Sequence, residues 1–218
     1  LGASTVEAWG VACGPDGTWL VPGFGVDGRL DQVYRRAHMD GGWRLLPTPG
    51  VWSIKRAHAL HMPTQAGDKA KDVWICEGPW DGMALWEVAH GMGVDIVAVP
   101  GCNVWRQEWT EACRGRNVTL WFDSDHPRTQ GNRVFRAGYD GMVRVAKRLS
   151  GVAASVRWVR WGPDGYDPAR PSGWDVRDHL TSDRADADRR RAYLGDLLTK
   201  IEDAPPEWFS GVTILSLN

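Results

Sequence analysis

The sequence predicts an α/β protein in which a small strand-rich segment precedes an open parallel sheet flanked by helices. Two observations support this fold class. From residue 72 onward, short apolar runs alternate with stretches whose apolar residues recur at helical spacing, as in βαβ units. Before residue 63, short strand-like runs are separated by turns that contain glycine. A chain of 218 residues is long enough to bury a core in both parts.

The first 62 residues are expected to form a small antiparallel meander. Strand-like runs at 18–25, 28–38 and 41–50 are separated by the turn signals VDGR and MDGGW. The polar stretch HMPTQAGDKAKD contains Pro and Gly, and it predicts a linker or surface loop at 61–72. We therefore assign a basic N-terminal subdomain of α+β type to residues 1–71.

The α/β domain is assigned to residues 72–182, with four strands. The run VTLWF at 118–122 is apolar on both faces, as a central parallel strand must be. Residues 183–218 are assigned to a last helix and a tail, because PPEWFSGVTILSLN is typical of an extended tail or linker. The other strands are expected at 72–76, 94–101 and 154–161, and helices at 80–93, 104–115, 134–151 and 184–203.

Composition excludes several classes of protein. Apolar residues make up 43% of the chain, and no apolar run approaches the roughly 18–20 residues of a membrane span. The start LGASTVEAWG has neither the basic nor the apolar region of a signal peptide, and its missing initiator Met suggests a fragment of a longer protein. No C-x-x-C pair is present, which argues against a zinc ribbon and indicates a reducing cytoplasm. The cysteines are Cys13, Cys76, Cys102 and Cys113.

Basic residues gather in two zones, although the net charge of the chain is only −1. Beside acidic loop ends, such zones favour a site that holds a polyanion together with a metal ion. On charge alone, the two basic zones are explained equally well as solvent-exposed faces of the protein. The first zone contains Arg29, Arg35, Arg36, Arg44, Lys55 and Arg56, and the second contains Arg128, Arg133, Arg136, Arg144, Lys147 and Arg148.

Acidic residues follow the predicted parallel strands where each strand ends. Glu77 follows the strand at 72–76, while Asp123 and Asp125 follow the strand at 118–122. Since the carboxyl ends of parallel strands meet at one edge of a sheet, these acids are expected to lie together. Carboxylates gathered without thiolates or imidazoles suit Mg²⁺ or Mn²⁺, and the ion relieves their mutual repulsion.

Further residues near the strand ends have simpler explanations beside a functional one. Asp81 can serve a helix start, and Asp178 fits a turn or the first turn of a helix. Asp175 lies further along the chain, after the loop that follows the strand expected at 154–161. His126 is a candidate phosphate contact beside Asp125, although a loop histidine is usually only solvated.

Three of these motifs carry a family resemblance. VWICEGPWDGMAL resembles the first motif of the Toprim domain, VTLWFDSDHP resembles its Asp-x-Asp motif, and WDVRDHL is similar to the third acidic element of primases. The resemblance covers residues 72–182. It departs from the family pattern where HPRTQGNRVFR intervenes before the helix that follows the Asp-x-Asp motif. A rival third motif, GPDGYDPAR, would use Asp167 in place of Asp175.

The segment before residue 72 resembles the part that precedes Toprim in bacterial and phage-type primases. Pro22, Gly28, Arg36, Arg44 and Lys55 fall on matching positions of that segment. The resemblance implies the catalytic core of a DNA primase, from a phage or mobile-element primase-helicase. Such an enzyme makes short RNA primers on single-stranded DNA from nucleoside triphosphates, works with a replicative helicase in cis or in trans, and resides in the cytoplasm, the host's if phage-encoded.

The resemblance also implies roles for individual residues. Asp123, Asp125 and Asp175 would hold Mg²⁺ or Mn²⁺, and Glu77 would be a further ligand or a general base. Contacts with phosphates of the template or nucleotide would come from Arg36, Arg44, Lys55 and Arg56.

Other functions remain open on sequence grounds. A Toprim nuclease would use the same acids, but it would not be expected to carry the basic strand-rich segment. A non-catalytic DNA-binding remnant would not need to retain them all. A topoisomerase would need a tyrosine nucleophile in a separate domain. A phosphatase with an Asp-x-Asp nucleophile would carry that motif on the first strand of the sheet, whereas here it follows the third.

Overall fold

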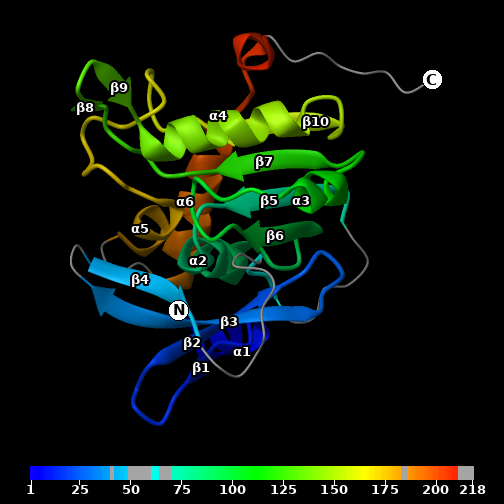
Figure 1. Cartoon of the computed structure of the whole chain (residues 1–218), viewed down its shortest axis with the longest axis vertical. Helices are drawn as coiled ribbons and strands as arrows, with labels where there is room; N and C mark the ends of the chain where they lie inside the picture. The colour runs from blue at the N-terminus through cyan, green and yellow to red at the C-terminus, as the bar shows by residue number, and fades with distance from the viewer. Residues whose placement is uncertain (40–41, 49–59, 64–69, 183–185, 211–218) are drawn as a thin grey trace.

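A computed structural model describes residues 1–39, 42–48, 60–63, 70–182 and 186–210. Two sheets dominate it, one antiparallel near the N-terminus and one mostly parallel that bears helices on both faces (Figure 1). This arrangement confirms the predicted fold class, a Toprim-like sheet preceded by a strand-rich part. None of the helices described is long and apolar enough to cross a membrane.

The N-terminal sheet is antiparallel, as predicted, with the strand order β1-β2-β3-β4. A short helix, α1, precedes it and was not predicted. Its next residue, Trp9, is 1% exposed, and a Cβ at Gly82 would lie 2.5 Å from the Trp9 ring. Packing against the second domain therefore stabilises α1, which is too short to form alone. The elements are α1 (Ala3–Ala8), β1 (Ala12–Cys13), β2 (Trp19–Phe24), β3 (Leu30–Met39) and β4 (Gly42–Pro47).

The second sheet has the order β11-β10-β7-β5-β6, with β11 alone running antiparallel to its neighbour. Its central strands β5 and β7 are buried from their second residue onward, which explains their largely apolar sequences. Val73 and Ile75 point into one core cluster, and Trp74 and Cys76 point into the other. The strands are β5 (Asp72–Cys76), β6 (Val94–Ala98), β7 (Asn117–Trp121), β10 (Ser155–Val159) and β11 (Ile201–Asp203).

Helices cover both faces of this sheet (Figure 1). On one face, α2, α5 and α6 enclose the cluster that contains Trp74, and on the other, α3 and α4 enclose the cluster that contains Val73. The helices are α2 (Pro79–Ala89), α3 (Gln107–Ala112), α4 (Ala137–Leu149), α5 (Val176–Thr181) and α6 (Ala187–Thr199).

The prediction of a linker at 61–72 is wrong for the first residue of that range. His61 is fully buried, and its backbone pairs with Ala98 at the end of β6, while Leu60 pairs with Phe24 at the end of β2. The His61 Nδ1 atom lies 2.8 Å from the carbonyl oxygen of Pro22, and burial lowers the pKa of this histidine to about 4. Residues 60–62 thus join the two sheets.

Two more expectations about local structure are wrong. The helix expected from residue 134 begins only at Ala137, because a hairpin of β8 (Arg128–Gln130) and β9 (Arg133–Phe135) precedes it. The tail expected from residue 205 begins with a 3-10 helix, η2 (Pro206–Phe209). Its Trp208 is buried against Trp158 and donates a hydrogen bond to the Tyr139 hydroxyl. The rest of the expected tail, 211–218, lies outside the described residues.

Candidate metal centre

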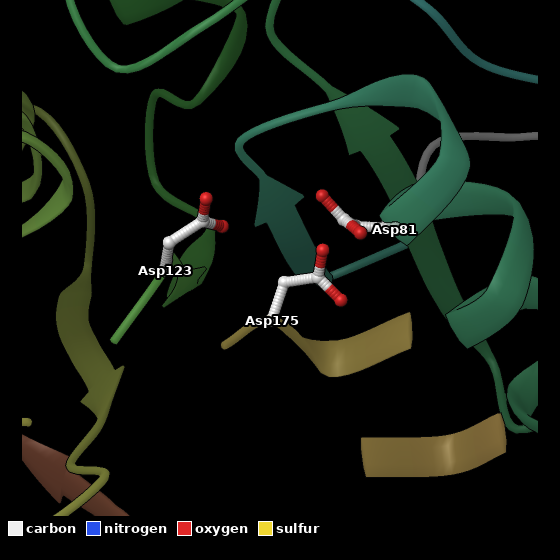
Figure 2. Close-up of side chains that lie close together, drawn as sticks. All are labelled: Asp81, Asp123 and Asp175. Atoms are coloured by element: carbon white, nitrogen blue, oxygen red, sulfur yellow. The ribbon is translucent and has the colours of Figure 1, made fainter. Parts of the chain in front are cut away.

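Three aspartates converge at the carboxyl edge of the parallel sheet. Asp81, Asp123 and Asp175 each offer a carboxylate oxygen, and these oxygens lie within 4.8 Å of one another (Figure 2). Asp81 comes from the first turn of α2, Asp123 from the end of β7 and Asp175 from the start of α5. We call this group the aspartate trio. Two of its members came from the predicted site, and Asp81 was a further candidate.

Asp175 reaches the trio through a backbone contact between distant segments. The Ser124 N–H donates to the Trp174 carbonyl at 2.8 Å, and the Gly173 N–H donates to the Ser124 carbonyl at 3.0 Å. Ser124 and Trp174 therefore form an antiparallel bridge, which sets Asp123 opposite Asp175. Asp175 also caps α5, because its Oδ1 accepts from the Asp178 N–H at 2.7 Å.

Asp81 does not act as a simple cap of α2. The N-cap position is Gly78, and no side-chain hydrogen bond caps this helix. Asp81 is 7% exposed, and its Oδ1 atom is buried without a hydrogen-bond partner. A buried carboxylate oxygen without a partner is costly, so its retention beside two other carboxylates is typical of a functional site.

The other two predicted acids, Glu77 and Asp125, lie beside Asp123 at the start of α4. The Asp125 Oδ2 atom accepts a hydrogen bond from the Gly138 N–H at 2.7 Å. A Cβ at Gly138 would lie 2.8 Å from the Asp123 carbonyl and 3.1 Å from Glu77 Oε2, an atom that is buried without a hydrogen-bond partner. Asp123 therefore adjoins both the other two members of the trio and this second acidic pair.

Burial and mutual repulsion raise the pKa values of Asp123, Asp81 and Glu77. For Asp123, burial is the largest cause, followed by the charges of Glu77 and Asp81, and the pKa is well above its usual range. The pKa of Asp81 is also well above its usual range, because of burial and then the charge of Asp175. Burial raises the pKa of Glu77 as well, and Asp125 adds to the effect.

Arg177 supplies a positive charge beside the trio. Its guanidinium lies 2.6 Å from Asp175 and 3.5 Å from Asp178. Burial alone would lower the Arg177 pKa, but Asp175 and Asp81 raise it by more. Although Arg177 limits the rise in the Asp175 pKa, burial still raises that pKa above its usual value. Sequence reasoning missed Arg177, although it lies two residues after a predicted ligand.

This donor set fits a hard divalent cation. All the ligand atoms of the trio are carboxylate oxygens, which Mg²⁺ and Mn²⁺ prefer. One arginine does not balance the negative charge of the trio and the neighbouring pair, and the raised pKa values express that imbalance.

The remaining acidic and histidine candidates lie outside the trio. Asp178 is in the first turn of α5 and pairs with Arg177. The imidazole of His126 contacts a backbone group, because its Nε2 lies 3.1 Å from the carbonyl oxygen of Asp167. The Asp167 carboxylate accepts from the Ala169 N–H at 2.9 Å, so the rival third motif folds onto its own loop.

The predicted basic contacts divide into two groups. Arg36 on β3 places its guanidinium 5.1 Å from the centre of the Trp80 ring, at the start of α2. Arg44 on β4 pairs with Ala37, so it lies on the opposite face of the sheet from Arg36. Lys55 and Arg56 lie outside the described residues.

We expect Gly138→Ala to lower both the melting temperature and the affinity for Mn²⁺. The added methyl group would push on the Asp123 carbonyl and Glu77 Oε2, and overpacking typically costs about 1–3 kcal/mol. Gly195→Ala in α6 is the matched control, because nothing lies within 4 Å of its Cβ and it should gain about 0.5–1 kcal/mol. Thermal melts with and without Mn²⁺ measure both effects. Equal behaviour of the two variants would contradict the tight fit at Gly138.

Solved structures with a similar fold include catalytic domains of DNA primases. Neither a protein-family model nor a curated protein sequence matches the chain. Among solved structures, a DNA primase domain from Pseudomonas aeruginosa is 17% identical and has a TM-score of 0.54, over 92% of this chain and 59% of that one. The DnaG catalytic core is 14% identical and has a TM-score of 0.56, over 100% of this chain and 79% of that one.

The RNA polymerase domain of Mycobacterium tuberculosis primase DnaG is also similar, with 18% identity and a TM-score of 0.53 over 91% of this chain and 62% of that one. The chain has the fold of a DnaG primase catalytic core. It spans about three fifths of the length of the Pseudomonas and Mycobacterium structures. A further structure of the Mycobacterium domain contains double-stranded DNA with a 6-nucleotide overhang, and there the TM-score is 0.50 at 19% identity, over 91% of this chain and 60% of that one.

Proposed function

We propose that this chain is the catalytic core of a DNA primase, which joins ribonucleotides on a DNA template with the help of Mg²⁺ or Mn²⁺. The observation that carries the proposal is the extent of the structural likeness, which includes the N-terminal sheet as well as the sheet that bears the acids. A Toprim nuclease would need only the second sheet and its acids. In this proposal residues 1–71 form the basic subdomain, residues 72–182 the Toprim catalytic domain, and residues 183–218 a C-terminal helix and its tail.

The acids would have different roles at the reacting phosphate. Asp123 and Asp175, with Asp81, would hold the metal ion, and Asp125 would hold Asp123 and the start of α4 in position. When bound, the metal ion would neutralise charge on the triphosphate and on the leaving pyrophosphate. Glu77 would act as the general base towards the 3′-hydroxyl, because its raised pKa favours proton transfer.

The basic residues would bind the substrates. Arg36, which lies over the Trp80 ring at the start of α2, would contact the triphosphate, while Arg44, Lys55 and Arg56 would contact phosphates of the single-stranded template. The DNA complex of the Mycobacterium domain supports a nucleic-acid partner. A replicative helicase, in cis or in trans, would deliver the template, in the cytoplasm of a cell or of a phage-infected host.

Titration calorimetry with ATP and AMP in the presence of Mn²⁺ tests this function. We expect residues 1–218 to bind ATP at least about tenfold more tightly than AMP, because phosphates form charge-assisted hydrogen bonds with arginine. Arg36→Ala should remove most of that preference. Leu30→Ala is the control, because this exposed side chain at the start of β3 carries no charge. Equal affinities for ATP and AMP, with metal-dependent degradation of single-stranded DNA that Asp123→Asn abolishes, would favour a nuclease instead.

A further inference from the structure

A basic hairpin follows Asp123 and Asp125 in the chain and precedes α4. It is formed by β8 and β9, which are joined by a two-residue turn at Gly131 and Asn132. Gly131 has φ +59, the left-handed conformation that such tight hairpin turns require. Of the strand residues, only Phe135 is even partly buried, and Val134 is 64% exposed. The hairpin therefore projects from the protein and contributes little to its core.

The base of this hairpin is fixed to the candidate site at both ends. On the near side, the Asp125 Oδ2 atom accepts from the Gly138 N–H, which closes the segment between them. The His126 N–H donates to Ser172 Oγ at 3.0 Å. On the far side, Arg136 donates to the Asp164 carbonyl, and its guanidinium lies 3.7 Å from the centre of the Tyr139 ring. The hairpin is thus held in one place relative to Asp123.

The hairpin carries positive charge that the described part of the protein does not neutralise. Residues 126–137 contain three arginines and one histidine and no acidic residue. Arg128 and Arg133 are exposed, and neither guanidinium forms an ion pair or hydrogen bond with a described residue. Arg128 pairs with Phe135 and Gln130 pairs with Arg133, so both arginines lie on one face of the hairpin.

The spacing of these two arginines suits a nucleic-acid backbone. As diagonal neighbours across two strands, their side chains start about 7–8 Å apart. Phosphates on one strand of a duplex follow one another at about 3.4 Å along the helix axis and lie further apart through space, a range that two long arginine side chains can span. The pair can therefore contact one strand at two points, and exposed arginines are well suited to bind phosphate.

The hairpin and the N-terminal sheet lie on opposite sides of the acids. The N-terminal sheet meets the parallel sheet at β6 through His61 and Ala98, whereas the hairpin follows β7 (Figure 1). If the N-terminal sheet holds the incoming template, the product must leave the acids on the opposite side, past the hairpin. A strand made at Asp123 is still paired with its template there, so the nucleic acid at the hairpin is a duplex.

We propose that the β8–β9 hairpin binds the phosphate backbone of the primer–template duplex through Arg128 and Arg133. This proposal rests on the proposed primase function, which it extends to the exit path of the product. The hairpin would retain a short primer near the acids by charge alone, without reading its sequence.

The test is binding of a fluorescent RNA–DNA duplex by residues 1–218, without nucleotide, from 50 to 200 mM salt. Each lost phosphate contact lowers the slope of log affinity against log salt by about 0.9. The double variant Arg128→Ala/Arg133→Ala should therefore lower the slope by about 1.8, so that its affinity falls about 12-fold less over this range than that of the wild type. A single strand of equal length is the second probe, and its slope should change less.

Arg189→Ala/Arg191→Ala is the matched control. It removes the same charge from exposed positions of α6, which packs on the opposite face of the parallel sheet from α4, and it should leave the slope unchanged. A duplex slope that the hairpin variant does not lower, or wild-type protein that does not bind the duplex, would overturn the proposal. Failure of the primase function would appear differently, as wild-type protein that joins no nucleotides although the hairpin still governs duplex binding.

Discussion

Asp123→Asn is expected to lower metal-dependent nucleotide joining by about a thousandfold or more while the fold stays intact. Asp123 is central because it adjoins Asp81 and Asp175 as well as Glu77. Asn has nearly the same shape but no charge, so it would weaken metal binding without leaving a cavity. A thousandfold loss corresponds to about 4 kcal/mol of transition-state stabilisation. Extension of a labelled dinucleotide on a single-stranded template, followed on a sequencing gel, measures the rate.

Asp203→Asn is the control for this variant. Asp203 is an exposed carboxylate on β11, outside the acidic group, so its loss should change the rate by less than about twofold. A melting temperature of the Asp123 variant many degrees below that of the wild type would mean that Asp123 is a structural residue, contrary to the prediction.

The metal-free protein is expected to become less stable relative to Asp123→Asn as the pH rises. The folded-state pKa of Asp123 is raised well above 3.8, so the folded state binds more protons than the unfolded state between these two values. Its contribution to the free energy of unfolding is therefore neutral below pH 4, and it becomes unfavourable as the pH rises toward the folded pKa. Since Asn does not titrate, the variant escapes this loss.

Thermal melts of both proteins at pH 4.5, 6, 7.5 and 9 measure this difference. We expect the melting temperature of the variant to exceed that of the wild type by a margin that grows with pH, by about 2–4 °C for each kcal/mol. The lowered pKa of His61 acts in the opposite direction between pH 6.5 and 4, but it acts on both proteins and cancels. A constant margin across this pH range would contradict the raised pKa.

Metal should reverse the effect in the wild type alone. With Mn²⁺ at about 100 times its dissociation constant, the wild type should gain about 2.7 kcal/mol, or about 5–10 °C at pH 7.5. Asp123→Asn should gain much less at the same concentration. The gain of the wild type should also shrink at pH 4.5, because protonated carboxyl groups are poor ligands.

Local patterns in the sequence were sufficient for the sheets and for the edge on which the acids lie. A strand such as VTLWF is apolar on both faces when helices cover both faces of its sheet. Five residues of sequence therefore suffice to indicate the parallel sheet. Glu77 and Asp123 follow parallel strands directly, and chain direction alone brings them to one edge. These inferences need no knowledge of long-range contacts.

The tertiary structure alone decided which acids meet and what surrounds them. Asp175 faces Asp123 because Ser124 pairs with Trp174, a backbone contact across fifty residues that no local propensity encodes. Asp81 belongs to the trio because α2 packs on the sheet at a particular rotation about its own axis. Trp208 is buried because it packs against the rings of Trp158 and Tyr139. Periodicity reports which face of an element is buried, whereas the partner that buries it depends on how the whole chain packs.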